Sequence, residues 1–170
     1  MGNSNLKITA FEYQLEILKV ELNQIDSAIR QMDDITKSIK DWAIVTWTVS
    51  VGVALKENPG TIIALTAIIP FLFWIVDARY RKIQRSFIYR LNLISDFLNN
   101  EKLLTQSFKE QRLIDFTLLD PRAKKNHGEN YNSYICIFRT LRFGSVGNLY
   151  IGLIIISLLL YFMKTIFKTF

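Results

Sequence analysis

The chain has 170 residues, of which 50% are hydrophobic and 21% are charged, and its formal net charge at pH 7 is +6. The chain has only one cysteine, so an internal disulfide is excluded. It also has only one histidine, which excludes most metal sites and most pairs of a nucleophile with a base. We therefore expect no metal and no cofactor. The apolar residues are gathered into blocks instead of being spread at a helix or strand period. This segregation favours an integral membrane protein over a soluble domain of the same composition.

Residues 1–41 predict one long cytoplasmic helix with a coiled-coil pattern. From residue 8 the apolar positions recur at alternating steps of three and four, and a 3.5-residue period buries a narrow stripe against a partner helix. We call the centre of this stripe the first seam: Leu15, Leu18, Leu22, Ile25, Ile29 and Met32. It predicts self-association, while packing on a later helix of the same chain is the alternative. The acidic residues of this helix, Glu21 and Asp33 among them, lie off the seam and are expected on a solvated face.

Residues 42–77 predict a transmembrane helical hairpin, because two uncharged apolar runs, 42–55 and 61–76, are separated by a short polar break. A helix needs about 20 apolar residues to cross a bilayer, so the first run is short unless its charged flanks extend to the interfaces. Basic residues lie just before the first run and just after the second, which places both arms in the cytoplasm. Pro70 predicts a kink in the second run.

The first run also carries a stripe of small and polar residues. Thr46, Ser50 and Ala54 recur at four-residue steps, with Glu57 roughly in line at the outer end. Such a face tolerates water and can line a pore, but it equally lets two membrane helices approach closely. The residues alone favour the packing interpretation, and the four side chains remain candidates for lining a pore.

Residues 78–142 predict a cytoplasmic helical region. The helix that leaves the membrane continues to about Leu98, and its apolar positions can pack on the N-terminal helix as an antiparallel pair. Asn99 and Asn100 predict a break, after which 101–118 is expected to be helical with Leu104, Phe108 and Ile114 buried.

The remainder of the chain is predicted to hold a loop and a third membrane helix. Asp120 and Pro121 predict a turn, and 131–142 is compatible with a strand or with the start of the last helix. Residues 143–170 contain a run without charge from 144 to 163, followed by a tail. The fold class expected for the whole chain is all-α, an integral membrane helical protein.

The loop contains a basic cluster with the only histidine. Arg122, Lys124, Lys125 and His127 form either a solvated loop or a weak contact for RNA or anionic lipid. Arg122 precedes His127 by five positions, and this spacing resembles the ribonuclease motif of the HEPN families. The resemblance implies that the histidine acts on the 2′-hydroxyl group of RNA and the arginine on the phosphate.

Together with the hairpin, the coiled N-terminal helix and the size, this motif makes the chain similar to the small membrane accessory proteins of type VI-B CRISPR systems. The resemblance covers the layout of the chain, and Arg122 and His127 match residue by residue. It implies a homo-oligomeric, pore-like effector in the bacterial inner membrane that is not an enzyme. The effector would be linked in function to an RNA-guided RNA nuclease, and would depolarise the membrane after viral RNA is cut. The alternatives are a membrane-tethered HEPN-type ribonuclease using Arg122 and His127, and a non-conducting membrane anchor for a cytoplasmic partner.

Overall fold

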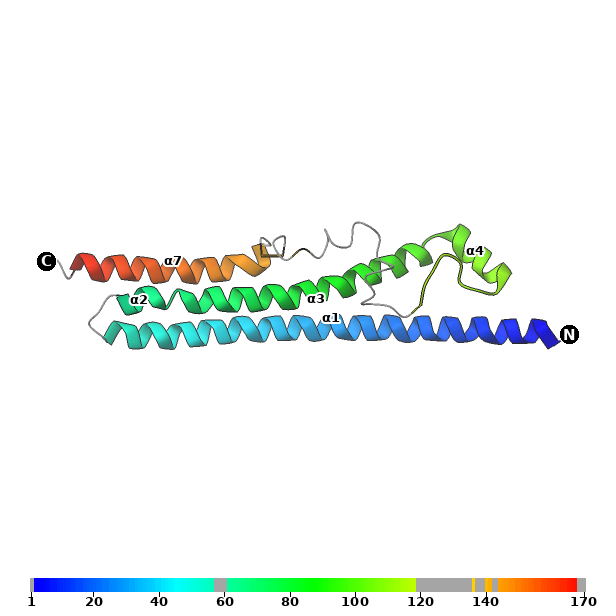
Figure 1. The fold of residues 1–170 in the computed structure, drawn as a ribbon, viewed down its shortest axis with the longest axis horizontal. Helices are drawn as coiled ribbons and strands as arrows, with labels where there is room; N and C mark the ends of the chain where they lie inside the picture. The colour runs from blue at the N-terminus through cyan, green and yellow to red at the C-terminus, as the bar shows by residue number, and fades with distance from the viewer. Residues whose placement is uncertain (1, 57–60, 119–135, 137–139, 142–143, 168–170) are drawn as a thin grey trace. The chain divides into compact units, whose positions relative to one another are not determined.

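The computed structural model describes residues 2–56, 61–118, 136, 140–141 and 144–167. The helices of these residues are α1 (Gly2–Lys56), α2 (Thr61–Leu65), α3 (Ile68–Leu98), α4 (Glu101–Glu110) and α7 (Gly144–Phe167) (Figure 1). Over the described ranges there is no strand, and the predicted all-α class is confirmed.

The chain divides into two compact units, each assembled from two separate segments. Unit 1 comprises Met1–Gln31 and Gln84–Ile135, and unit 2 comprises Met32–Ile83 and Cys136–Phe170. Helices α1 and α3 each contribute residues to both units. Each unit therefore pairs an early part of the sequence with a late one.

Helix α1 is continuous over 55 residues, from Gly2 to Lys56. The sequence predicted one long helix over residues 1–41, and in the structure this helix continues through the first apolar run. The helix contains no proline, and its only glycines are Gly2 and Gly52, so few of its residues oppose helix formation.

The first seam packs within unit 1. Leu18 and Ile25 are buried against Ile94 of α3. The half-buried residues around them are Leu22, Ile29, Phe87, Leu91, Phe116 and Leu118. Because Arg90 bonds to Glu21 and Gln84 bonds to the carbonyl of Ile29, the two helices run antiparallel. The predicted antiparallel pair is thus confirmed. The first seam, which was also predicted to join separate chains, is covered by α3 of the same chain.

Helix α4 is shorter than predicted. It begins after Asn100, whose side chain accepts a hydrogen bond of 3.2 Å from the backbone N–H of Leu103 and so caps the helix. It ends at Glu110, and the capping residue Gln111 adopts the left-handed conformation with φ 51° and ψ 45°. The predicted helix over 111–118 is therefore wrong. Of the three residues expected to be buried, Leu104 and Ile114 are half-buried and Phe108 is 56% exposed.

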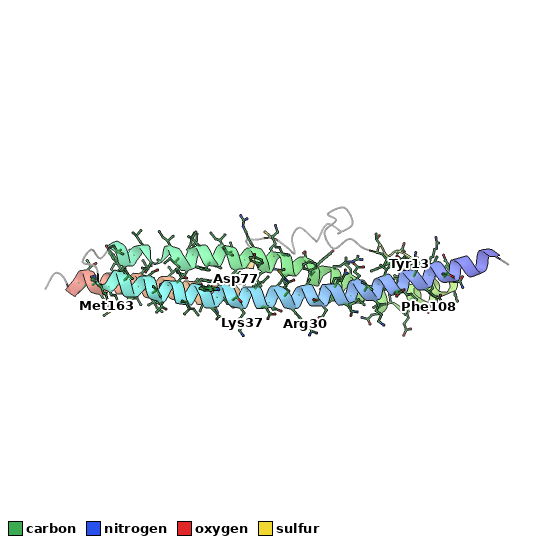
Figure 2. The ribbon with its side chains drawn as sticks, turned by 90° about the horizontal axis from the view of Figure 1, so that it is seen from below. Tyr13, Arg30, Lys37, Asp77, Phe108 and Met163 are labelled. Atoms are coloured by element: carbon green, nitrogen blue, oxygen red, sulfur yellow. The ribbon has the colours of Figure 1, made fainter. Side chains whose placement is uncertain are left out.

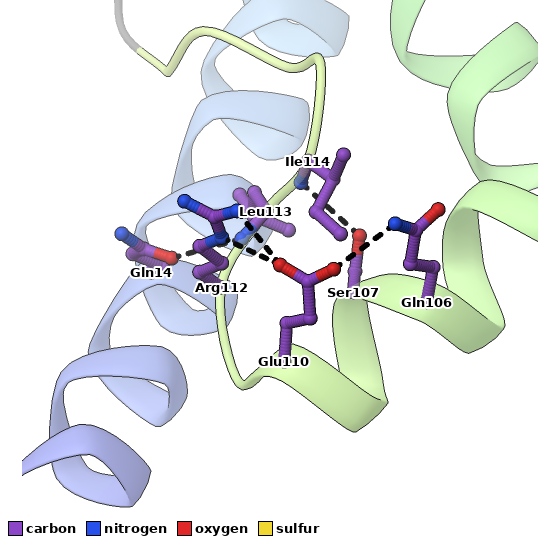
Figure 3. A network of polar contacts seen from close by, with 7 residues as sticks. All are labelled: Gln14, Gln106, Ser107, Glu110, Arg112, Leu113 and Ile114. Carbon is purple, nitrogen blue, oxygen red and sulfur yellow. Dashed lines mark hydrogen bonds and ion pairs between the residues drawn. The ribbon is translucent and has the colours of Figure 1, made fainter.

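The backbone after α4 leaves the helix because side chains supply its hydrogen-bond acceptors (Figure 3). The N–H of Leu113 donates to Gln14 Oε1 and the N–H of Ile114 donates to Ser107 Oγ, both at 3.2 Å. A buried backbone donor needs a partner, and these two acceptors replace the carbonyls that a continued helix would use. Residues 113 and 114 are thereby held against α1 and α4 within unit 1.

Unit 2 packs three helical stretches side by side: the later part of α1, the early part of α3, and α7 (Figure 1). Trp47 of α1 and Thr66, between α2 and α3, both contact Ser157 of α7, whereas Asp77 of α3 contacts Tyr150. Residue numbers rise along α3 as they fall along α7, so these two helices are antiparallel. Helix α7 is parallel to α1 and antiparallel to α3.

The kink predicted at Pro70 is found as a break between α2 and α3. Thr66 and Ala67 form a turn in which the N–H of Ile69 donates to the carbonyl of Thr66 at 3.3 Å. Proline has no N–H to offer that carbonyl, and its ring clashes with an α-helical carbonyl four residues earlier. The helix therefore changes its hydrogen-bond pattern just before Pro70.

Two helices are long and apolar enough to cross a membrane, Ile62–Leu98 and Val146–Ile166. They contain the predicted second run and most of the predicted third helix. The end of α1, predicted as the first arm of the hairpin, is not one of them. Only 14 residues separate Asp41 from Lys56, so the uncharged run is too short to meet the same criterion alone.

Candidate functional site

Unit 2 exposes many large apolar side chains, and it buries several polar side chains among apolar ones. Its buried polar residues are Thr36, Thr66, Asp77, Thr140 and Ser157. Exposed apolar residues cover the outward faces of all three packed stretches, including Trp42, Val45, Val49 and Val53 of α1, Leu65, Phe71 and Leu72, and Ile155, Leu159, Phe162 and Met163 of α7. The exposed fraction of Trp42 is 65%, which is far above the value for a core residue. A soluble protein of this size rarely leaves such a continuous apolar surface in water.

Three helical stretches of unit 2 meet at Ser157, which is fully buried. Trp47 Nε1 donates to Ser157 Oγ at 2.8 Å, and Ser157 Oγ donates to the carbonyl of Leu153 at 3.0 Å. Thr66 Oγ1 lies 3.3 Å from Ser157 Oγ and donates to the carbonyl of Ile63 at 2.7 Å. Each of these polar side chains has a partner inside the unit, so an apolar surrounding would cost them little.

A second group of interacting polar side chains in unit 2 contains charged residues, and we call it the charged cluster. Asp77 and Tyr150 are both fully buried, and the tyrosine hydroxyl donates to Asp77 Oδ2 at 3.2 Å. Lys40 of α1 and Arg81 of α3 stabilise the Asp77 carboxylate electrostatically, whereas Asp77 Oδ1 has no hydrogen-bond partner among the described residues. Figure 2 marks Asp77 on α3, and shows Lys37 pointing away from the neighbouring helices.

Arg81 links this cluster to α1 through a different residue. Its Nη1 lies 2.9 Å from Asp33 Oδ1, in a salt bridge between α3 and α1. Asp77 and Arg81 lie four residues apart on α3, a spacing that favours an ion pair within one helix. The structure instead gives Arg81 its salt bridge across to α1 and leaves it an electrostatic interaction with Asp77.

Lys164 holds the other end of unit 2. Its Nζ lies 3.4 Å from the carbonyl oxygens of Ala54 and Leu55 at the end of α1. The last carbonyls of a helix have no partner within it, and a cation there also stabilises the helix dipole. This contact gives Lys164 a structural role within unit 2.

The predicted pore-lining residues have different environments. Thr46 and Ser50 are half-buried, and Ser50 Oγ donates to the carbonyl of Thr46 at 2.8 Å. Ala54 is fully buried inside unit 2. Glu57 lies outside the described residues. A pore-lining role for this stripe stays a prediction.

Arg122, Lys124, Lys125 and His127 lie outside the described residues, so no geometry can be given for the motif that resembles the HEPN families. The described part of the chain contains no group of three or more His, Cys, Asp or Glu residues able to hold a metal ion.

Sequence reasoning missed a buried ion pair in unit 1. Arg90 Nε and Nη2 donate to the two oxygens of Glu21 at 2.8 and 3.1 Å, and Nη2 also donates to the carbonyl of Thr117 at 2.6 Å. The guanidinium carbon lies 4.9 Å from the centre of the Phe116 ring. The expectation that Glu21 is solvated is wrong, since it is only 2% exposed. Its position, three residues after Leu18 and four before Ile25, was the available signal, because it lies beside the seam.

Comparison with models of protein families, with curated proteins and with solved structures finds no match to this chain.

Proposed function

We propose that unit 2 is embedded in a lipid bilayer and that the chain is an oligomeric, pore-like membrane effector. The observation that carries this proposal is the apolar outer surface of unit 2, where Trp42, Val49 and Phe162 are exposed while Asp77 and Ser157 are buried. Lipid favours an apolar surface and requires every polar group to find its partner within the protein. Of each candidate span's most apolar window, only 28% is buried, whereas the core helix of a soluble protein is mostly buried.

In this proposal the charged cluster lies near one face of the bilayer. From Gly144 to Met163, α7 rises about 30 Å at 1.5 Å per residue, which equals the thickness of the hydrocarbon core. Tyr150 is six residues inside that stretch, so it lies about 9 Å below the surface. Asp77, which accepts a hydrogen bond from Tyr150, then lies just inside the hydrocarbon on the cytoplasmic side. Ionisable residues at such depth are rare and are associated with function.

The short apolar end of α1 supports association between copies. Residues 42–55 rise about 21 Å, roughly 9 Å less than the hydrocarbon thickness. A short hydrophobic stretch is accommodated by bilayer thinning, by extension of flanking lysines, or by oligomerisation. Lys56 and Lys164 both lie at the outer end of unit 2, where their long side chains can reach the interface.

Any conducting path is proposed to run between copies of the chain. Ile63, Ala78, Tyr150 and Val146 are almost completely buried, so side chains occupy the interior of unit 2. Of the predicted stripe, Thr46 and Ser50 retain exposed surface that can face such a path. The links to the bacterial inner membrane, to an RNA-guided RNA nuclease and to depolarisation during antiviral defence follow from the resemblance to type VI-B CRISPR accessory proteins.

The test is ion flux through vesicles that contain the purified protein. We expect wild-type protein to release a trapped potassium gradient, and Thr46→Leu with Ser50→Leu to reduce the release without removing the protein from the vesicles. The paired variants Arg122→Ala and His127→Ala should leave the release unchanged. Vesicles that hold the protein but do not leak would favour the membrane anchor. A chain that is folded and monodisperse in buffer without detergent would overturn the membrane assignment itself.

A further inference from the structure

Helix α1 carries a second uncharged stripe within unit 1, on the side away from α3. Its positions are Tyr13, Ile17, Val20, Gln24, Ser27 and Gln31, at steps of four, three, four, three and four. This is again a period of 3.5 residues. Tyr13 and Val20 are 64% and 49% exposed, and Gln24, Ser27 and Gln31 are also exposed. We call this stripe the second seam.

The second seam is hollowed at its centre. A shallow groove is lined by Val20, Asn23, Gln24, Ser27, Ala28 and Gln31, all from α1. The small side chains of Ser27 and Ala28 leave space between the longer amide side chains. In a coiled coil, a side chain of one helix inserts into such a space on the facing helix.

The packing of the described residues of unit 1 does not account for this pattern. Leu18 and Ile25 of the first seam already cover Ile94 of α3, and they lie on the opposite side of α1 from Val20 and Gln24. A helix face that only meets water usually carries charges, as Arg30 and Asp26 do in their exposed salt bridge of 2.9 Å. Arg30 points away from the neighbouring helices in Figure 2.

The chemistry of the second seam fits an identical surface. Glutamine and serine side chains both donate and accept hydrogen bonds, so each can pair with its own copy. The stripe has no charge, so placing two copies together creates no like-charge repulsion. A membrane surface or an acidic partner would instead call for basic side chains, and the flanking residues Glu16, Lys19, Asp26 and Arg30 are mixed in sign.

We propose that the second seam binds the same seam of another copy of this chain, with the two α1 helices parallel and in register. The parallel direction rests on the proposed membrane function, because copies inserted in one bilayer share one orientation. Gln24 and Gln31 then face their counterparts, and paired amides at such positions fix the register of a coiled coil.

Disulfide trapping in membranes tests the contact and its register. In a Cys136→Ser background, Val20→Cys should form a disulfide-linked dimer under mild oxidation, and the adjacent, exposed Lys19→Cys should not. Equal trapping at both positions, or trapping at Lys19 alone, would overturn the proposed face.

A second experiment uses charge repulsion and measures the molecular mass of the protein in mild detergent. Gln24→Glu places two carboxylates together and should shift the protein to a smaller species, whereas Lys19→Glu should leave the mass unchanged. Circular dichroism checks that both variants keep their helix content. Membrane-bound protein that is monomeric, or an oligomer that Gln24→Glu leaves intact, overturns the second seam while the membrane assignment stands. Protein that needs no detergent, yet is trapped at Val20→Cys, overturns the membrane assignment and keeps the seam.

Discussion

Units 1 and 2 differ in the kind of side chain that they expose. Unit 1 buries the apolar residues Leu18, Ile25 and Ile94 and leaves charged residues such as Arg30 outside. Unit 2 buries Asp77 and Ser157 and leaves apolar side chains outside. Helix α1 contributes to both units without a break, so the difference comes from the sequence pattern and not from the type of secondary structure.

The contrast indicates two different surroundings for one chain. In water, hiding an apolar stripe stabilises a helix pair, and charges belong on the surface. In lipid, apolar surface is tolerated and polar groups hold helices together. Unit 1 follows the first rule, and unit 2 follows the second. Substitutions that behave differently in water and lipid can therefore break or sharpen this comparison.

The largest effect is expected in unit 1, where Arg90→Ala leaves the carboxylate of Glu21 buried without its partner. Breaking a buried pair from one side costs about 3–5 kcal/mol of stability. We expect hydrogen exchange of α1 between residues 10 and 31 to rise strongly, with little change in α7. The double variant Glu21→Leu with Arg90→Met removes both charges and should keep most of the stability. Equal damage from the single and double variants would show that the charge itself is not the cause.

The next effect concerns the outer surface of unit 2. Val49 is 62% exposed, so Val49→Asp should be nearly neutral if water surrounds it, and should cost about 2.5–3.5 kcal/mol if it faces the middle of a bilayer. We expect a marked loss of membrane-inserted protein in cell fractions. Leu98→Asp, at a 40% exposed position of unit 1, is the control and should leave insertion unchanged. Normal insertion of Val49→Asp would remove the contrast between the units.

A smaller loss is expected inside unit 2 from Tyr150→Phe. The change removes the hydroxyl that donates to Asp77 and keeps the ring, so it isolates one hydrogen bond. Leaving a buried carboxylate less satisfied costs about 1–3 kcal/mol. Thermal unfolding in detergent should report a lower midpoint for Tyr150→Phe, and a smaller further loss when Asp77→Asn is added. Independent, additive losses would show that the two side chains do not interact.

The sequence predicted the helices better than their partners. Periodicity located α1, the break at Asn99 and Asn100, and the uncharged run of α7, because each depends on local spacing. It did not predict which surface covers the first seam, since a heptad pattern is the same for a partner in the same chain or in another. It also missed the end of α4 at Glu110. That end depends on Gln14, which is distant in the sequence and supplies an acceptor to Leu113.

The polar core of unit 2 was likewise beyond local reasoning. Ser157 was one serine within an apolar run, and only the packing of α7 against Trp47 and Thr66 gives it partners. Local spacing pairs Asp77 with Arg81, four residues away, although its hydrogen bond comes from Tyr150 on another helix. The positions of Arg122 and His127 stay predictions from the sequence, since they lie outside the described residues.

The smallest effect is expected at the solvated end of α4. Hydrogen bonds from Gln106 and Arg112 hold the pKa of Glu110 below its ordinary value (Figure 3). A lowered pKa in the folded state stabilises the fold above the unfolded pKa, and this contribution is lost as the pH falls through the folded pKa. Glu110→Gln should therefore lower the midpoint of unfolding slightly at neutral pH, and the difference from wild type should vanish in acid. Glu12→Gln, at an exposed position of α1, is the matched control.

The salt dependence of the same variant then distinguishes the surroundings of the two units. The Glu110 carboxylate is exposed to water, where added salt weakens charge interactions, so the small effect of Glu110→Gln should shrink in concentrated salt. The effect of Tyr150→Phe should persist, because the bond to Asp77 is shielded from solvent inside unit 2. If salt removes both effects equally, water reaches the interior of unit 2. Its polar core would then be a hydrated site, and its surroundings would not differ from those of unit 1.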